Sequence, residues 1–360
     1  MSDRRTDEVW ILGATGRVGR AFAERLSRQG LADIVLVGRS EDGLRRVAEG
    51  LTTDVRVIVL DGFDSMAEAV GRERPHVVVN LLGSYAETAP ALARACMPGG
   101  AYIDLANDLT ALKALVGMHD EAKRNGSTLI SGAGFGVLAT EALVVRLCEG
   151  RPTPAAVRVD ALASFAPEDG VVGEAFAQTL VDVITTGGRS YRDGRLIPIR
   201  LASNFHRHTL PDGTTVASSA VPSGELFAAQ TVSGAPNVDF TSALAPSALM
   251  VRAILPLMTR LLRLPVMRRM MVRLMAALKT TAAPRPRPHS WGHATIAWPD
   301  GTTREGWLRA DDAMDYTADA LAAITIALTN GTPAPHGAFT PAAAFGAQIA
   351  VDAGGTFINA

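Results

Sequence analysis

Residues 9–20 read Val9-Trp10-Ile11-Leu12-Gly13-Ala14-Thr15-Gly16-Arg17-Val18-Gly19-Arg20, and this stretch decides the fold. Its four leading apolar residues predict a buried strand, and residues 21–29 predict a helix with Phe22 and Leu26 on one face. Glycines follow the spacing G-x-x-G-x-x-G. Gly13 permits a tight turn, Gly16 lets the backbone approach a pyrophosphate, and Gly19 lets the helix pack against the strand.

The turn between this strand and its helix is therefore an expected dinucleotide site. Free amides at a helix N-terminus, together with the helix dipole, bind anions. We expect the cofactor to contact Gly13, Thr15, Gly16, Arg17, Val18 and Gly19. The spacing differs from the commoner G-x-G-x-x-G, and a glycine-rich turn without a ligand would also show it.

Length and composition indicate a globular protein of two domains. The chain has 360 residues, of which 48% are apolar and 20% charged. Its two cysteines, Cys96 and Cys148, each lie in a helical pattern, so no disulfide framework is expected. The first eight residues are polar and charged, which predicts no signal or transit sequence and a cytoplasmic protein.

The end of the second predicted strand, residues 33–37, indicates which dinucleotide binds. Gly38-Arg39-Ser40 follows this strand, and no acidic residue stands directly before Arg39 to bind ribose hydroxyls. Arg39 can pair with a 2′-phosphate and Ser40 can donate to it. The sequence therefore favours NADP over NAD, although Arg39 could also be a solvated surface residue.

Four more strands, at residues 56–60, 76–79, 101–103 and 128–131, alternate with helices. This alternation predicts a doubly wound parallel sheet, an α/β Rossmann domain, whose ligands lie at the carboxyl ends of the strands. Asp61 follows the third strand, either near adenine or as a cap of the next helix. We expect the segments after the fourth, fifth and sixth strands to face the nicotinamide, and among their residues we expect Asn80, Leu81 and Gly83 to contact the cofactor.

The pattern changes near residue 155. Residues 157–163 alternate like a strand, residues 173–185 form an apolar helix, and hairpin signals stand at Asp193-Gly194, Asp212-Gly213 and Asp300-Gly301. These features predict a second α+β domain with a largely antiparallel sheet. We predict domains at residues 1–136 and 137–335, and a segment at 336–360 that returns to the first domain.

Several catalytic arrangements are excluded. The three lysines have no tyrosine four residues earlier, which rules out the short-chain dehydrogenase mechanism. Neither cysteine lies near a predicted strand end, which argues against an activated thiol. His206 and His208 share one face of a strand, but no third ligand is evident, so no metal is predicted and a histidine in a substrate cleft is the alternative.

The stretch 248–278 is rich in leucine, methionine and arginine. No acidic residue and nine basic residues occur from Phe240 to Pro299. The longest charge-free run around this stretch, residues 240–251, is too short to span a bilayer. The stretch could lie on a membrane surface as a peripheral anchor, dock an acidic carrier protein, cover a long apolar substrate, or form a lid or homodimer contact with solvated arginines.

Several segments together resemble the saccharopine dehydrogenase-like reductases, which include the trans-acting enoyl reductases. The matching segments are GATG at 13–16 with Gly38-Arg39, VNLLGSY at 79–85, ARAC at 93–96, GAYIDL at 100–105, AGFG at 133–136 and FTPAAAFG at 339–346. The resemblance implies an NADP-binding Rossmann domain, a mixed-sheet second domain and a C-terminal segment on the first. Family members reduce imines or the double bonds of acyl chains. This chain departs from the family at residues 106–108 and after Phe135.

These observations predict NADPH-dependent reduction of a C=C or C=N bond in a small, apolar or acyl-linked molecule, without a nucleic-acid partner. Tyr85, just beyond the fourth strand, is the first candidate proton donor, and Asn107, Asp108 and His206 are further candidates. Tyr85 could instead be a ring at a domain interface, and Asp108 a helix cap. The alternatives of a different class are an NADP-binding scaffold without catalysis and a peripheral membrane protein.

Overall fold

The computed structural model describes residues 6–360 except 32, 172–173, 246–254, 256, 263 and 331–333. The chain divides into two compact units, which are described separately. The first comprises residues 1–106, 110–134 and 314–354, and the second comprises residues 107–109, 135–313 and 355–360.

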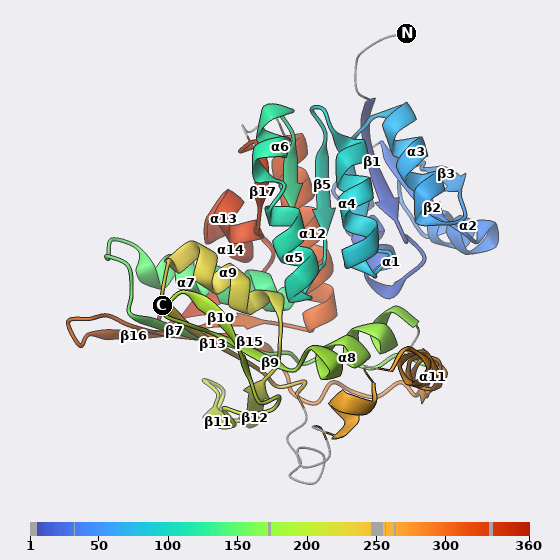
Figure 1. The fold of residues 1–360 in the computed structure, drawn as a ribbon. Helices are drawn as coiled ribbons and strands as arrows, with labels where there is room; N and C mark the ends of the chain where they lie inside the picture. Colours follow the sequence, from blue (N-terminus) through green and yellow to red (C-terminus); the bar gives the residue numbers. More distant parts are fainter. Residues whose placement is uncertain are drawn as a thin grey trace. The chain divides into compact units, whose positions relative to one another are not determined.

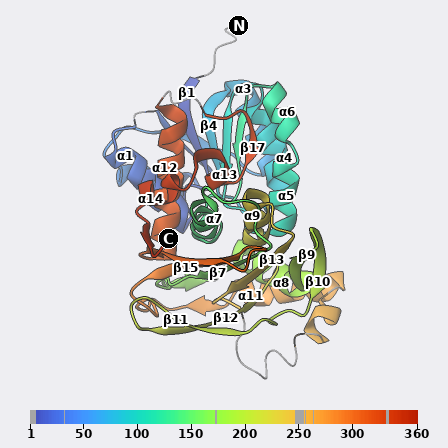
Figure 2. The ribbon, with the colours of Figure 1, turned by 90° about the vertical axis from the view of Figure 1, so that its left-hand side faces the viewer.

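The first unit is built on a parallel sheet of seven strands (Figures 1 and 2). The sheet has the order β17-β6-β5-β4-β1-β2-β3, which contains the strand order of a doubly wound sheet. Its strands are β1 (Thr6–Leu12), β2 (Ile34–Gly38), β3 (Arg56–Val59), β4 (Pro75–Asn80), β5 (Ala101–Asp104), β6 (Thr128–Ile130) and β17 (Gly337–Phe339). The predicted fold class is confirmed.

Helices cover both faces of this sheet. The helices of the unit are α1 (Arg17–Arg28), α2 (Glu41–Glu49), α3 (Phe63–Glu73), α4 (Tyr85–Cys96), α5 (Leu109–Val116), α6 (His119–Arg124), α12 (Ala313–Thr329), α13 (Pro341–Phe345) and α14 (Gln348–Asp352). Helices α3 to α6 lie on one face, and α1 and α12 on the other (Figures 1 and 2). Trp10 and Tyr102 are fully buried in the core beneath the first group. Two helices, α5 and α6, follow β5 before the chain reaches β6, and Gly117 lies between them.

C-terminal segments complete the first unit. Strand β17 pairs in parallel with β6, and Gly337 stands opposite Thr128. On α12, Asp319 and Asp315 both form ion pairs with Arg25 of α1, the latter at 3.3 Å. The division therefore differs from the predicted domain boundaries, because α12 groups with the first unit although we placed it in residues 137–335.

The second unit contains a mixed sheet of nine strands. Its main order is β10-β9-β13-β7-β15-β16-β18, and β12 joins β13 and pairs with β11. The strands are β7 (Ala156–Leu162), β9 (Gly188–Arg192), β10 (Arg195–Ile199), β11 (His206–Thr209), β12 (Thr215–Ala220), β13 (Asn237–Ser242), β15 (Ser290–Ala297), β16 (Thr303–Ala310) and β18 (Thr356–Ile358). A separate pair joins β8 (Gly170–Val171) to β14 (Lys279–Thr280).

All three predicted hairpins are present in this unit: β9–β10, β11–β12 and β15–β16. The first turns at Asp193 and Gly194, whose φ angles of 50° and 72° suit a two-residue turn between twisted strands. The expected largely antiparallel sheet is confirmed, and the pair β13·β7 is its parallel exception.

Four described helices accompany the sheet: α7 (Phe135–Cys148), α8 (Glu174–Thr186), α9 (Gly224–Ser233) and α11 (Pro265–Ala276). Helix α7 packs closely on β15, because a Cβ placed on Gly292 would lie 3.1 Å from the Ala139 Cβ. Part of the stretch 248–278 lies outside the described residues. Among the helices that the structure describes, none combines the length and the apolar character needed to cross a bilayer.

Candidate cofactor site and histidine cluster

The first turn of the first unit has the close backbone packing predicted for its glycines. Gly13 has φ +85°, and a Cβ there would lie 3.0 Å from the Leu81 carbonyl oxygen. A Cβ on Gly19 would lie 2.6 Å from the Gly13 carbonyl oxygen. Gly16 is different, because it is exposed and its Cβ would meet only the Gly13 oxygen, at 3.4 Å. Two glycines are thus required by packing, and Gly16 leaves backbone open to a ligand.

Helix α1 begins at this open position. Gly16 is its N-cap, no side chain caps it, and no acidic residue stands in its first turn. A helix N-terminus without a side-chain cap or an acidic first turn is typical of helices that bind phosphate. Arg17 and Val18 form the start of the helix, and the Thr15 carbonyl accepts a hydrogen bond of 2.7 Å from Arg20. The arrangement fits a pyrophosphate.

The loop after β2 lies beside this turn. A Cβ on Gly43 would be 3.1 Å from both Thr15 Cγ2 and Ser40 Oγ, which shows that the two loops adjoin. Ser40 caps α2 by accepting a hydrogen bond of 3.1 Å from the Gly43 amide, so its hydroxyl proton stays available. Arg39 is exposed and has no ion-pair partner among the described residues. A free cation and a hydroxyl donor here suit a 2′-phosphate.

The loop after β3 shows whether Asp61 caps the next helix. Helix α3 is capped by Gly62, and no side chain bonds to its N-terminus. Asp61 is exposed and lies one residue before that cap. Its interpretation as the helix cap is wrong, because the helix begins one residue too late for it. A position near adenine stays a prediction.

The loop after β4 is held in an uncommon backbone conformation. Gly83 and Ser84 both have positive φ, 78° and 43°. Ser84 lies in the left-handed region, which non-glycine residues rarely adopt outside tight or functional loops. The Leu81 amide donates to the Leu12 carbonyl at 2.9 Å, and Thr88 Oγ1 donates to the Gly83 carbonyl at 3.0 Å.

Asn80 fixes this loop from beneath. Its side chain is fully buried and donates to Thr88 Oγ1 at 3.0 Å and to Tyr102 Oη at 2.9 Å. Its side-chain oxygen accepts from the Leu82 amide at 3.1 Å. These internal partners make Asn80 a residue that positions the loop, although we expected it to contact the cofactor.

Asp104, at the end of β5, is the centre of the same network. Its carboxylate accepts from Tyr102 at 3.0 Å, from Ser131 at 2.8 Å, and from the amides of Ala106 and Gly132 at 3.0 and 3.3 Å. Burial raises the pKa of Asp104, although these four hydrogen bonds oppose the shift. The network links the carboxyl ends of the neighbouring strands β4, β5 and β6.

Tyr85 is the first residue of α4, which follows the loop after β4, and it packs in part against the core. Burial and the neighbouring Asp104 carboxylate raise the pKa of the Tyr85 phenol, whereas a hydrogen bond to the Leu105 backbone opposes the shift. Tyr85 is consequently protonated at neutral pH. A protonated hydroxyl can donate to a substrate, and the role of Tyr85 as proton donor stays a prediction.

The other two candidates after β5 have different surroundings. Asn107 is exposed, and its carbonyl accepts from the Gly224 amide at 2.6 Å and from Ser223 Oγ at 3.1 Å, so its backbone binds the start of α9. Asp108 is half-buried and directly precedes α5, the place of a helix cap. Both roles weighed for Asp108 stay predictions.

Sequence reasoning missed the acid Glu225. It lies in the first turn of α9 and is 5% exposed, and it accepts a short hydrogen bond from Ser223. Burial raises its pKa. A Cβ on Gly136 would lie 2.1 Å from Glu225 Oε1, so the glycine makes room for the carboxyl. An acid in a first helical turn is common, and nothing local in the sequence announces its burial.

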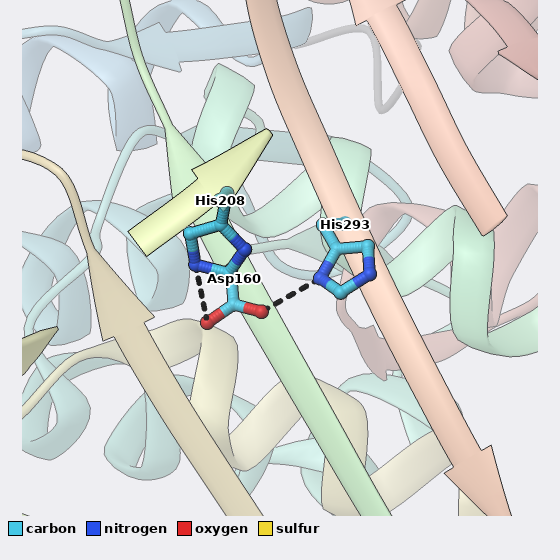
Figure 3. Close-up of side chains that lie close together, drawn as sticks. All are labelled: Asp160, His208 and His293. Atoms are coloured by element: carbon cyan, nitrogen blue, oxygen red, sulfur yellow. Dashed lines mark hydrogen bonds and ion pairs between the residues drawn. The ribbon is translucent and has the colours of Figure 1, made fainter. Parts of the chain in front are cut away.

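The second unit holds a buried cluster of Asp160, His208 and His293 (Figure 3). Asp160 on β7 stands opposite His293 on β15 and Thr241 on β13. His293 Nδ1 lies 2.8 Å from Asp160 Oδ2, and His208 Nε2 lies 3.7 Å from Asp160 Oδ1. His208 Nε2 also lies 2.8 Å from Ser218 Oγ.

Every member of the cluster has a partner. Arg158 donates to Asp160 at 2.9 Å, and His293 Nε2 lies 2.9 Å from Glu305 Oε1. Burial alone would raise the pKa of Asp160, but His293 and Arg158 hold it well below its usual range. Burial lowers the pKa of His208 to about 4, against the attraction of Asp160. Because Arg158 already neutralises Asp160, a metal cation here would face a guanidinium, and we assign no metal.

The predicted histidine candidate is the neighbour of this cluster. His206 is exposed, and its ring centroid lies 5.3 Å from that of His208, which confirms that both rings share one face of β11. The buried ring is that of His208. The acid and the second histidine beside it come from strands distant in the sequence, which is why no third member was evident.

Comparison with known proteins bears on the first unit. Residues 9–130 match the family described as the saccharopine dehydrogenase NADP binding domain. This segment is similar to the saccharopine dehydrogenase NADP-binding domain over about a third of the chain. The predicted resemblance and the predicted cofactor, NADP, are thereby confirmed.

The relatives of this NADP-binding domain share only part of their length with the chain. An uncharacterized oxidoreductase of Staphylococcus epidermidis is 40% identical over 80 residues, which cover 20% of this chain and 34% of that protein. A Mycobacterium tuberculosis protein provisionally named a trans-acting enoyl reductase is 29% identical over 150 residues, 40% of this chain and 36% of that protein. The chain thus spans about a third of the length of the curated relatives it matches.

A solved structure extends the likeness beyond the NADP-binding domain. The apo saccharopine dehydrogenase (L-Glu forming) of Saccharomyces cerevisiae superposes with a TM-score of 0.59 over 97% of this chain and 96% of that one. The two sequences are 13% identical. The likeness shows a common fold and leaves the substrate open.

Proposed function

We propose that this protein is an NADPH-dependent reductase of an electron-poor C=C or C=N bond in a lipid or specialised-metabolite pathway. The observation that carries the proposal is an NADP-binding domain with its cofactor groups available. Helix α1 is uncapped at Gly16, and Arg39 has no described ion-pair partner. Names of relatives, one oxidoreductase and one provisional enoyl reductase, support reduction as the reaction class.

The cofactor residues follow from this placement. Backbone amides at the start of α1 would hold the pyrophosphate, and Arg39 with Ser40 would hold the 2′-phosphate. Gly83 has no side chain, so the backbone of the loop after β4 could contact the nicotinamide. When bound, NADPH supplies the hydride, and the protein supplies orientation and the proton.

Tyr85 is the proposed proton donor. Its hydroxyl is protonated, and the Asp104 network fixes the strand ends beside it. Donation to the substrate carbonyl of an enoyl group, or to the nitrogen of an imine, would neutralise the charge that hydride addition creates. A positioned acid of this kind contributes about 10²- to 10⁴-fold to a rate.

The substrate class is tested by following NADPH oxidation with an enoyl thioester and with an imino acid. Turnover of the thioester is expected, since the enoyl reductase name of one relative favours an acyl substrate. Activity on the imino acid alone would assign the C=N alternative. Tight NADPH binding without oxidation by either substrate would favour a non-catalytic scaffold.

Tyr85→Phe tests the proton donor in the same assay. The expected result is a loss of about 10²-fold or more in kcat with NADPH affinity unchanged, because the phenyl ring keeps the packing and loses only the proton. Tyr191→Phe is a control for the loss of a tyrosine hydroxyl, since Tyr191 is a buried tyrosine on β9 of the second unit. Full turnover by Tyr85→Phe would remove tyrosine from the mechanism.

A further inference from the structure

Exposed apolar side chains gather in one short stretch of the second unit. Eleven large hydrophobic residues are exposed among the described residues, and seven of them fall within residues 257–278. They are Leu257, Leu261, Leu264, Val266, Met270, Leu274 and Leu278, which are 41–67% exposed. Isolated exposed leucines are ordinary, but a concentration of this kind marks an interaction surface.

This surface is a second apolar face, separate from the one that holds α11 in place. On its inner face, Val272 packs with Leu262, Ala177 and Val181 in a small core shared with α8. Arg268 also points that way and donates to Asp182 at 2.6 Å. The outer face presents Val266, Met270 and Leu274 at intervals of four residues, the spacing of one helical stripe.

Unpaired cations flank the stripe. Arg260, Arg269, Arg273 and Lys279 are exposed, and none forms an ion pair with a described residue. No acidic residue occurs between Phe240 and Pro299, whereas the rest of the chain has an acidic excess. The combination is an apolar ridge with a positive border on an otherwise negative protein.

We propose that residues 257–278 dock on an anionic phospholipid surface. Leucine, methionine and valine side chains beside arginines are typical of helices that lie at the headgroup boundary. The charge of the border complements anionic headgroups, and the acidic remainder orients the protein with this face toward the membrane. No aromatic residue occurs between Phe240 and Trp291, so leucine, methionine and valine side chains alone would make the apolar contact.

The proposal is tested by co-sedimentation of the full chain with vesicles of phosphatidylcholine, with and without phosphatidylglycerol. Binding to the phosphatidylglycerol vesicles is expected at low salt, weakening as salt screens the arginines. No sedimentation with these vesicles at low salt would overturn the proposal, and an acidic protein partner would then be the better occupant.

Two sets of substitutions separate the apolar and charged contributions. Val266→Ser, Met270→Ser and Leu274→Ser together should weaken vesicle binding at least about a hundred-fold. Arg269→Gln with Arg273→Gln should weaken it about ten- to thirty-fold. All five side chains are exposed, so the melting temperature should not change. Unaltered vesicle binding by both sets would overturn the proposal.

Matched controls use exposed residues elsewhere. Val59→Ser with Val351→Ser removes apolar side chains that are 45% and 38% exposed, and Arg195→Gln with Arg309→Gln removes exposed arginines from the second unit. None of these four should alter vesicle binding. Leu274→Trp adds a second readout, because the four native tryptophans are all buried. Its fluorescence should shift to the blue with phosphatidylglycerol vesicles, and an unshifted spectrum would contradict insertion of the stripe.

Discussion

The β-strand ends of the first unit and the histidine cluster of the second are both rich in polar groups, but they leave those groups in opposite states. At the strand ends of the first unit, α1 begins without a side-chain cap, and Arg39 has no ion-pair partner among the described residues. In the cluster, Asp160 accepts from Arg158, Thr241 and His293, and His293 reaches Glu305 as well. Groups left open await a ligand, whereas groups that satisfy one another hold a fold together.

This contrast assigns different consequences to substitutions in the two places. Changes in the cluster should alter stability and leave cofactor affinity intact. Changes at exposed positions beside the strand ends of the first unit should lower cofactor affinity and leave stability intact.

Asp160→Asn should have the largest effect, a loss of about 3–5 kcal/mol in the free energy of unfolding. The amide keeps the shape of the side chain but leaves the half-buried Arg158 without its counter-charge and His293 without a carboxylate partner. Urea denaturation measures the change. Asp239→Asn breaks a similar arginine pair, with Arg192, that is more exposed and should cost at most about 1 kcal/mol. Equal losses in the two variants would contradict the role assigned to the cluster.

His208 should make stability fall between about pH 6.5 and pH 4. Its folded pKa of about 4 lies below the ordinary value of 6.5, so the unfolded chain binds the proton more readily as the pH falls. The loss is on the order of 2–3 kcal/mol across this window. His208→Asn should flatten the urea midpoint over the same range, and an unchanged pH profile would show that another group titrates.

Gly19→Ala and Gly16→Ala should separate packing from ligand contact within one turn. Gly19→Ala should lower stability by about 1–3 kcal/mol without any ligand, because its Cβ would meet backbone at 2.6 Å. Gly16→Ala should leave the apo protein stable, since its Cβ has only a 3.4 Å neighbour, and should weaken NADPH binding. Thermal unfolding with and without NADPH measures both, and normal NADPH affinity in Gly16→Ala would contradict the open site.

Much of the first unit was predictable because its signals are local. Glycines at 13, 16 and 19 and the run of apolar strands are read directly from neighbouring residues, and the hairpin at Asp193-Gly194 follows from turn chemistry alone. The place of α12 was not predictable, since its ion pairs with Arg25 join residues almost 300 positions apart.

The sites show the same limit. Tyr85 and Arg39 could be predicted as site residues because each follows the end of a predicted strand. Asp160 and His293 meet only through the register of β7 with β15, which no single stretch of sequence specifies. The burial of Glu225 likewise depends on Gly136, which lies on another helix.

We propose that Arg39, in the loop after β2 of the first unit, binds the 2′-phosphate of NADP. Its most direct test is the ratio of the NADH and NADPH dissociation constants, measured by fluorescence titration for the wild type and for Arg39→Gln. NADPH binding by Arg39→Gln should weaken by about ten- to a hundred-fold, with NADH affinity nearly unchanged, because only the contact to the phosphate is lost. An unchanged ratio in Arg39→Gln would contradict it.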